Sequence, residues 1–434
     1  MFISAPGAYR PRASACPGLF RIVPARDGGI CRVKIPLGRL AVAQCRAVAD
    51  VASRYGSGVI EVTNRANLQI RGIGATEAGA AAETLVGAAL GPDQPDGDDI
   101  RNVMVSPTAG IDPGQIIDTR PLAQALLDRV QAESACRVLS PKFSFLVDGG
   151  EDVAVVDHPH DIWVSSLDTK RAAIGFAGCP PTSAGDIEAS GVVRNDAVVD
   201  VILAAVALFQ EMVDGPAITR MRHLFASRSR EAFLRRLGLD AETTGWRRST
   251  SQSRAIGTGR QRDGLAYVGA VPPVGRLTPA MLTGAAEIVA RYGADELRLT
   301  PWQSLLVPFL HESDTTAAIS SLERLGFVCD AEAPRAGMIA CAGAPGCSAG
   351  LTDTKADALA LAQMLPRGAR TVHLSGCRKS CAVPAVADIT LVATVTGVYD
   401  VYAKSADAGA GRFGRQVARN STTGDAARLL RDDS

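Results

Sequence analysis

The sequence lacks the features that would tie it to a membrane or to nucleic acid. Its most apolar stretch, residues 201–209, is far shorter than the about 20 residues that a membrane-spanning helix needs. Its 46 basic and 45 acidic residues nearly cancel, which argues against a broad surface for nucleic acid. Arg10 and Arg12 interrupt the N-terminal segment, and no apolar core of signal-peptide length follows. We therefore expect a cytoplasmic protein with neither nucleic acid nor a membrane as a partner.

The chain has ample apolar material and ten cysteines. Hydrophobic residues make up 47% of the 434 residues, which is enough for several cores without disulfide bonds. Because thiols stay reduced in the cytoplasm, the ten cysteines suggest metal binding or catalysis rather than disulfides.

An internal repeat organises the chain. One block recurs 237 positions later and a second block recurs 235 positions later, in the same order. Shared Ala-rich helix composition is the alternative, but it would not reproduce the matched Gly, Pro and Asp-Thr positions. The pattern predicts two fused copies of one half, each with short β-branched strands and Ala/Leu-rich helices. The matched segments are PLGRL at 36–40 and PVGRL at 273–277, Arg54-Tyr-Gly56 and Arg291-Tyr-Gly293, and Asp118-Thr119 and Asp353-Thr354.

Four cysteines form two close pairs, and these pairs occur in the second copy alone. One pair has C-x5-C spacing and the other C-x3-C spacing, with 29 residues between them. A cuboidal cluster needs four thiolates, and the small residues inside the first pair suit a loop around a bulky core. Inert buried thiols and structural zinc are the alternatives, although zinc fits C-x5-C spacing poorly. The four residues are Cys341, Cys347, Cys377 and Cys381; the other six, interpreted as packing or incidental thiols, are Cys16, Cys31, Cys45, Cys136, Cys179 and Cys329.

Basic and amide side chains gather in the first copy. The segment 63–71 alternates like a strand, which puts four polar side chains on one face. Converging cations would bind a polyanion, and arginine can hold carboxylates through two hydrogen bonds. Solvated arginines with surface partners are the alternative. The candidate binding residues are Arg65, Asn67, Arg71, Arg101 and Lys142, with Gln69 on the same strand face.

These motifs together resemble the sulfite/nitrite reductase superfamily. C-x5-C, about thirty residues and then G-C-x3-C is typical of its 4Fe-4S segment, and Thr63-x-Arg65 and Arg101-Asn-Val103 look like its anion-binding arginines. Two positions depart from the pattern: Ser144 replaces the second lysine of a Lys-x-Lys motif that begins at Lys142, and Arg71 stands where histidine is usual. Losing a cation from the anion site argues against sulfite or nitrite reduction.

The resemblance implies an α+β fold with an internal duplication: two ferredoxin-like half-domains and two larger α/β domains. It also implies a 4Fe-4S cluster on the four paired cysteines. The boundaries that we expect are 1–90 for the first half-domain, 100–240 for a first α/β unit that would bind substrate, 241–264 for an exposed linker, 265–330 for the second half-domain and 331–430 for the cluster-bearing unit.

Within the superfamily, the details look most like the precorrin-3B synthase branch of cobalamin biosynthesis. The opening CPGLFR at 16–21 and the segment HLSGCRKSCA at 373–382, followed by Pro384, carry this likeness. It implies an oxygen-dependent monooxygenase that hydroxylates the tetrapyrrole precorrin-3A at a meso carbon, with γ-lactone formation. A sirohaem-dependent reductase of sulfite or nitrite is the alternative.

That branch is associated with a 4Fe-4S cluster, a mononuclear non-haem iron, molecular oxygen and a reduced nicotinamide. The sequence lacks a Gly-rich dinucleotide fingerprint after a strand, so we expect an external electron donor, either an NADH-dependent reductase or a ferredoxin. For the mononuclear iron, His158 and His160 form the one close histidine pair, with Asp157 and Asp161 beside them. A polar turn is the alternative for this segment, and His223 and His373 are further candidates.

Overall fold

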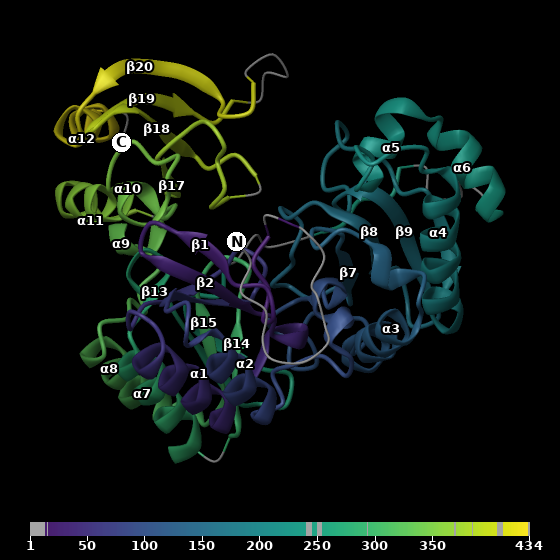
Figure 1. Ribbon diagram of the computed structural model, residues 1–434, viewed down its shortest axis with the longest axis horizontal. Helices are drawn as coiled ribbons and strands as arrows, with labels where there is room; N and C mark the ends of the chain where they lie inside the picture. Colours follow the sequence, from purple (N-terminus) through teal and green to yellow (C-terminus); the bar gives the residue numbers. More distant parts are fainter. Residues whose placement is uncertain are drawn as a thin grey trace.

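The computed structural model describes residues 14, 16–239, 245–249, 254–292, 294–368, 370–383, 385–405 and 411–432. The described strands form four five-stranded sheets, and the ribbon divides into a central body with one α/β unit on each side (Figure 1). Gly293 of the second Arg-Tyr-Gly segment, Pro384 and parts of the expected linker lie outside the described residues.

The central body contains two ferredoxin-like sheets of matching order. The first runs β1-β2-β5-β4-β13 and the second β11-β12-β15-β14-β3, so each strand has a counterpart in the other copy. The first-copy elements are β1 (Val23–Ala25), β2 (Gly28–Val33), α1 (Val42–Arg54), β4 (Ile60–Val62), β5 (Leu68–Ile73) and α2 (Ala78–Gly87). The second-copy elements are β11 (Gly257–Arg260), β12 (Ala266–Ala270), α7 (Pro279–Arg291), β14 (Glu296–Leu299), β15 (Leu305–Leu310) and α8 (Thr315–Arg324).

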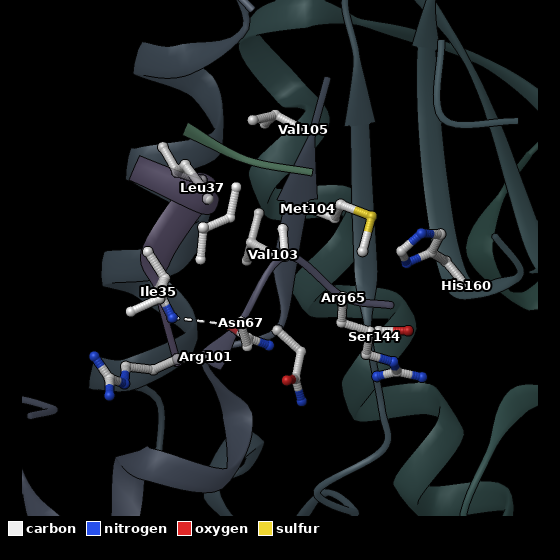
Figure 2. Close-up of a pocket in the computed structure, with 14 residues that line it drawn as sticks. Ile35, Leu37, Arg65, Asn67, Arg101, Val103, Met104, Val105, Ser144 and His160 are labelled. Atoms are coloured by element: carbon white, nitrogen blue, oxygen red, sulfur yellow. Dashed lines mark hydrogen bonds between the residues drawn. The ribbon is translucent and has the colours of Figure 1, made fainter. Parts of the chain in front are cut away.

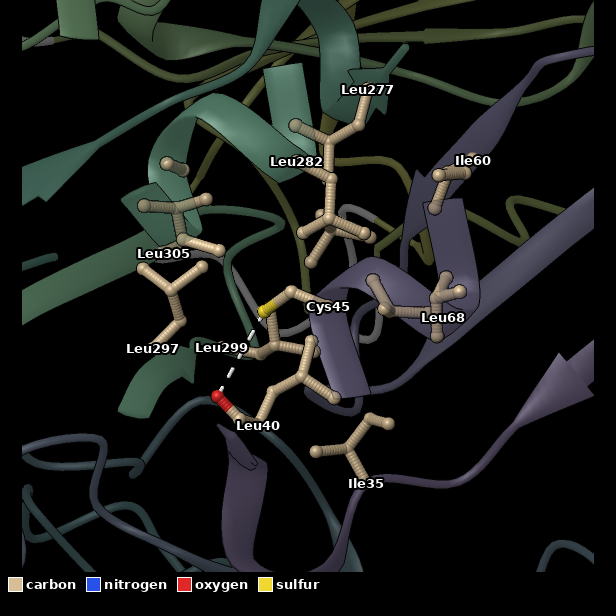
Figure 3. Packing of buried hydrophobic residues seen from close by; sticks show 14 of the residues in the cluster. Ile35, Leu40, Cys45, Ile60, Leu68, Leu277, Leu282, Leu297, Leu299 and Leu305 are labelled. Atoms are coloured by element: carbon tan, nitrogen blue, oxygen red, sulfur yellow. Dashed lines mark hydrogen bonds between the residues drawn. The ribbon is translucent and has the colours of Figure 1, made fainter. Parts of the chain in front are cut away.

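The two halves exchange their edge strands. β3 (Arg39–Ala41) belongs to the first copy but pairs antiparallel with β14 of the second, while β13 (Arg276–Leu277) pairs with β4 of the first. Helices α1 and α7 pack against each other across the same boundary. Leu40 and Cys45 consequently face Leu297, Leu299 and Leu305 in one continuous apolar core (Figure 3). The half-domains therefore share a single core.

The two outer units also match strand for strand. In both, three parallel strands are followed by two antiparallel ones, in the orders β6-β7-β8-β9-β10 and β16-β17-β18-β19-β20. The first unit has β6 (Val103–Val105), α3 (Arg120–Ala132), β7 (Phe145–Asp148), β8 (His160–Ser166), β9 (Arg171–Gly178), β10 (Gly191–Arg194), α4 (Val198–Met212), α5 (Met221–Ser227) and α6 (Arg230–Leu237). The second has α9 (Pro334–Gly337), β16 (Met338–Ala340), α10 (Gly343–Gly346), α11 (Thr354–Met364), β17 (Val372–Ser375), β18 (Ile389–Val395), β19 (Val398–Ala403), β20 (Arg415–Ser421) and α12 (Thr423–Asp432).

Local geometry repeats as well as topology. Leu37 and Val274 both adopt left-handed backbone conformations, with φ of 54° and 47°, and they are 237 positions apart. Ala66 and Gln303, separated by the same offset, do so at 51° and 60°. Side chains other than glycine rarely adopt such angles, and they persist where the surrounding structure fixes them. The predicted duplication and the α+β fold class are confirmed by this repeated architecture.

The expected exposed linker differs from what the structure contains. Residues 257–260 lie inside it by sequence but form β11, an edge strand of the second ferredoxin-like sheet. The Gly-Thr-Gly-Arg sequence has no apolar alternation that would predict a strand. An edge strand can form without it, because backbone pairing with one neighbour holds it in place. Arg248 and Ala255, also within the expected linker, are buried. No helix in the described part of the chain combines the length and apolarity needed to cross a membrane.

The shared core predicts that the two halves unfold together. Leu40→Ala and Leu277→Ala each empty a fully buried site at an exchanged strand, so each should lower the free energy of unfolding by about 2–5 kcal/mol. Ile187→Ala, at a side chain that is 61% exposed, should change it by less than about 0.5 kcal/mol. Urea unfolding followed by circular dichroism measures both. Two separate transitions in either leucine variant would contradict a shared core.

Candidate functional site

The paired cysteines leave one edge of a parallel sheet. β16 and β17 are parallel neighbours, so their C-terminal ends lie on the same side of the sheet. Cys341 directly follows β16, and Cys377 follows β17 after one intervening residue. Cys347 follows the short helix α10, and Cys381 lies four residues beyond Cys377. Every cysteine of the chain is a free thiol. The topology of the second α/β unit thus brings the two motifs together.

Backbone packing around Cys341 requires glycine. The Gly376 N–H donates to Cys341 Sγ at 3.2 Å, and a Cβ added at Gly376 would lie 3.3 Å from Gly350 Cα. A Cβ at Gly350 would come within 2.5 Å of the Gly343 carbonyl carbon. Thr354 Oγ1 also approaches Cys341 Sγ at 3.6 Å. Small residues therefore let the two cysteine segments approach closely and direct hydrogen-bond donors at a sulfur.

Electrostatic coupling shows that the four thiols are neighbours. Burial raises the pKa of the Cys381 thiol, and Cys377, Cys341 and Cys347 raise it further as nearby negative charges. Among the described residues, however, no three His, Cys, Asp or Glu side chains converge on a point that would suit a single ion. Four neighbouring thiols are the donor set that a 4Fe-4S cluster requires, with one thiolate for each iron.

A buried ion-pair network fixes the cysteine loop to both halves. Arg71 donates to Asp27 at 2.6 and 2.8 Å and to the Gly346 carbonyl, next to Cys347, at 2.9 Å. Arg71 also contacts Glu61 at 3.3 Å. Although burial raises the pKa of Glu61, three surrounding cations (Lys355, Arg71 and Arg276) outweigh it and keep that pKa below its usual value. Arg71 is thus engaged within the protein, away from the candidate binding pocket.

The duplicated turns hold the second cysteine motif. Asn64 Nδ2 of the first copy donates to the Cys381 carbonyl at 3.4 Å, and Gln303 Nε2 of the second copy donates to the Ala382 carbonyl at 3.2 Å. Each turn contains one residue with a left-handed backbone conformation, Ala66 in the first copy and Gln303 in the second. The strained turns therefore position amides against the segment that carries Cys381.

A small pocket lies beside Arg65, between the first ferredoxin-like sheet and the first α/β unit (Figure 2). Arg65 Nη1 donates to the Lys142 carbonyl at 3.0 Å, and burial lowers the pKa of its guanidinium to about 10. Across the pocket, Met104 and His160 face each other, with Ser144 below them (Figure 2). Ser144 Oγ and both His160 nitrogens are buried without a hydrogen-bond partner. Buried polar groups of this kind need a ligand or water to satisfy them.

Of the other predicted binding residues, Asn67 and Arg101 line this pocket, and some of their polar groups are already engaged. Asn67 Oδ1 accepts from the Ile35 N–H at 2.8 Å, the dashed contact in Figure 2. Arg101 donates to the Leu90 and Gly91 carbonyls and contacts Asp98, and its side chain points away from His160 (Figure 2). Lys142 is exposed and does not line the pocket. Of the five residues, the structure leaves Arg65 with the most unused donors toward the cavity.

The histidines divide into engaged and unengaged groups. His158 uses both nitrogens, with Nδ1 at 2.6 Å from Asp157 and Nε2 at 3.0 Å from the Pro301 carbonyl. His160 and His373 are buried with neither nitrogen partnered. Burial lowers the pKa of His160, helped by Arg65, and lowers that of His373 to about 4. His223 lies near Thr219 on an exposed surface. The candidate pair at 158 and 160 therefore does not act as two free imidazoles.

Sequence reasoning missed the charged network around Arg71. Glu61, Asp27 and Lys355 belong to it, and nothing in their sequence positions indicates that they meet. Glu61 sits on β4 facing inward among cations from three segments that are distant in sequence. One signal was available: a charged residue in a short strand of otherwise β-branched residues is seldom buried without a partner.

Family models match more than half of the chain. The nitrite/sulfite reductase ferredoxin-like half domain matches residues 23–88 and 259–325, and the nitrite and sulphite reductase 4Fe-4S domain matches residues 96–244. The chain therefore belongs to the nitrite and sulfite reductase family, and its relatives are oxidoreductases. The four paired cysteines lie outside both matched regions.

Individual relatives include enzymes of two kinds. The chain is similar to precorrin-3B synthase of Sinorhizobium sp, with 29% identity over 96% of this chain and 91% of that protein. It is also similar to ferredoxin–nitrite reductase of Synechococcus elongatus, with 28% identity over 84% of this chain and 76% of that protein. The solved structure of the Mycobacterium tuberculosis NirA protein matches with a TM-score of 0.75 and 21% identity, covering 93% of this chain and 80% of that one. This structural similarity supports the assignment of the fold.

The low pKa of His373 predicts acid sensitivity. A buried neutral imidazole binds its proton at pH about 4, whereas the unfolded chain binds it near 6.5. Since the unfolded state binds more protons between these values, stability is complete above pH 6.5 and falls as the pH drops toward 4. His373→Gln should remove about 2 kcal/mol of the loss in unfolding free energy between pH 7 and pH 5. The exposed control His311→Gln should leave that loss unchanged; equal pH profiles for wild type and His373→Gln would contradict the assignment.

Proposed function

We propose that this chain is an oxygen-dependent precorrin-3B synthase acting in the cytoplasm. It would hydroxylate precorrin-3A at a meso carbon, after which a ring-A acetate closes a γ-lactone. One oxygen atom of O2 enters the substrate, and the other leaves as water after taking two electrons and two protons. The similarity to the Sinorhizobium precorrin-3B synthase over 96% of this chain supports the proposal.

The 4Fe-4S cluster would be held by Cys341, Cys347, Cys377 and Cys381. The fit rests on the donor set: four free, mutually coupled thiols at one sheet edge, with a glycine N–H directed at one sulfur. When bound, such a cluster supplies single-electron transfer. The protein around it supplies the buried Arg71 network and the two amides, Asn64 and Gln303, that hold the loops. Electrons would come from an external NADH-dependent reductase or ferredoxin.

The tetrapyrrole would lie beside Arg65. A substrate with many carboxylates suits a guanidinium that retains unused donors at a cavity lined by apolar residues such as Leu37 and Val103. Asn67 and Arg101 line the same pocket. Asn67 Oδ1 accepts from the Ile35 N–H and the Arg101 Nη atoms donate to backbone carbonyls, while Arg101 Nε is buried without a partner.

The observation that favours oxygenation over reduction is the chemistry of the pocket opposite Arg65. Nitrite and sulfite are small anions that cations would bind, whereas the unpartnered polar atoms of this pocket include those of Ser144 and of His160, whose burial holds its pKa well below the usual value. These groups can hydrogen-bond an uncharged reactant without attracting an anion. The alternative is a sirohaem-dependent nitrite or sulfite reductase, and the similarity to ferredoxin–nitrite reductases supports it.

A mononuclear iron has little support among the described residues. No three potential ligands converge among the described residues, and His158 has both nitrogens engaged, so His160 and His373 are the histidine candidates with unpartnered nitrogens. No step proposed above relies on this iron.

A visible spectrum with iron and sulfide analysis, on anaerobically purified protein, tests the proposal. We expect the broad brown absorption of an iron–sulfur cluster, no sharp sirohaem bands, and oxygen uptake on addition of precorrin-3A and a reducing system. Intense sirohaem bands with nitrite or sulfite turnover would replace the proposal by the reductase alternative.

The ligand assignment predicts the effect of removing one thiol. Cys377→Ser should abolish the cluster, seen as loss of acid-labile sulfide and of the brown absorption, because a serine hydroxyl is a poor ligand for iron in such a cluster. Cys179→Ser removes a thiol distant in sequence from both motifs and should keep the full iron and sulfide content. Retention of the cluster in Cys377→Ser would refute the assignment.

A further inference from the structure

A second cavity lies beside the Cys381 segment and is lined by Arg254, which forms no ion pair among the described residues. It is enclosed by the turn at 301–303, by Asp157 and His158, and by residues that follow Cys381. Trp302 and Gln303 occupy here the positions that Arg65 and Ala66 occupy in the first copy, 237 positions earlier. The duplication thus gives the second half a cavity of its own, in which the cation comes from Arg254.

Arg254 has donors to spare. Its Nη1 donates to the Ala336 carbonyl at 3.4 Å and its Nη2 to the Trp302 carbonyl at 3.3 Å. Its Nε is buried and has no partner, and no carboxylate of the described residues lies within ion-pair distance. A guanidinium has five N–H groups, so three remain unused. Burial lowers its pKa, and Asp157 and Asp388 oppose this from farther away. Charges in such surroundings are normally paired or bind a ligand.

The other polar groups of the cavity are already occupied. Asp157 accepts from His158 Nδ1 at 2.6 Å and from Trp302 Nε1 at 3.0 Å, which uses both of its oxygens. Thr371 Oγ1 donates to Asp388, and Gln303 donates to the Ala382 carbonyl. Arg254 is therefore the group with unsatisfied donors in this wall.

Apart from Asn64, whose Nδ2 donates to the Cys381 carbonyl, the rest of the lining is apolar, and this limits the kind of ligand. Ile339, Val383, Ala385, Val386 and Ala387 line the cavity together with the indole of Trp302. A cavity with an apolar wall and one guanidinium fits a carboxylate carried on an apolar stem. An inorganic anion would make no apolar contacts with this wall, and a neutral apolar ligand would not pair with the guanidinium.

We propose that Arg254 binds a side-chain carboxylate of the tetrapyrrole, with the acetate or propionate stem against Ile339, Val386 and Trp302. This inference rests on the proposed tetrapyrrole function and adds a binding residue from the second half. The ligand would then be held between Arg65 of the first copy and Arg254 from the segment joining the copies, next to the Cys381 loop.

Titration with coproporphyrin III, a tetrapyrrole with four carboxylates, tests the inference. The protein is purified with its cluster content matched between variants, and binding is followed by porphyrin fluorescence. Loss of a charge-assisted contact in Arg254→Gln should weaken binding by about 10- to 100-fold. Arg260→Gln alters an exposed arginine of the same segment and should stay within about twofold of wild type. With coproporphyrin III tetramethyl ester, delivered in dilute detergent, wild type and Arg254→Gln should bind equally.

The outcomes separate this inference from the proposed function. If wild type binds coproporphyrin III and Arg254→Gln binds it equally well, the Arg254 site is excluded while tetrapyrrole binding stands. If wild type does not bind the porphyrin, both are overturned. Arg254→Lys keeps the charge but loses the planar guanidinium that can form two parallel hydrogen bonds. It is the test variant to use if Arg254→Gln does not fold. Its binding should be weaker than that of wild type for the acid and unchanged for the ester; equal binding of the acid would overturn the inference.

Discussion

The buried charge network around Glu61 is the constraint on which the site depends. Glu61 is contacted by Arg71 of its own half, by Arg276 of the other half and by Lys355 of the helix after the cysteine loop. Removing one partner would weaken the compensation of a largely buried carboxylate and so disfavour the folded arrangement. The network therefore resists any rearrangement that separates the halves or moves the loop. Because Arg71 also holds the Gly346 carbonyl, it ties Cys347 to the shared core.

Strand exchange explains why such a network can form. β3 and β13 each complete the sheet of the opposite copy, and Arg276, one of the Glu61 partners, is carried on β13. Two separately folded half-domains would leave these edges open and Glu61 short of a cation. In the fused protein, the exchange brings residues that are more than 200 positions apart into one buried cluster. Duplication and exchange together make the cysteine loop part of the central body.

The sequence was informative where a motif or a repeat was local. Matched segments such as PLGRL and PVGRL revealed the duplication, and cysteine spacing identified the four coupled thiols. It was less informative where function depends on which partner a side chain meets. The expected strand over 63–71 begins only at Leu68, so Arg65 lies in the preceding turn and lines a pocket, while Arg71 on β5 is enclosed by Asp27 and Glu61. Periodicity gives the face of a strand but not what covers it, and Arg254 carried no signal at all.

The two copies have diverged in a way that creates asymmetry from a symmetric fold. Where the first copy has Arg65 the second has Trp302, and where the second has thiols the first has other residues. A flat ligand between the copies would meet cation and imidazole on one side, and indole, apolar residues and the cysteine loop on the other. With Arg254 in the second wall, carboxylates can be bound on both sides, but the surroundings of the two guanidiniums differ, so the two orientations of such a ligand are not equivalent. Orientation matters when one carbon of a macrocycle must be chosen, so under the proposed function the divergence of the copies would supply the selectivity of the reaction.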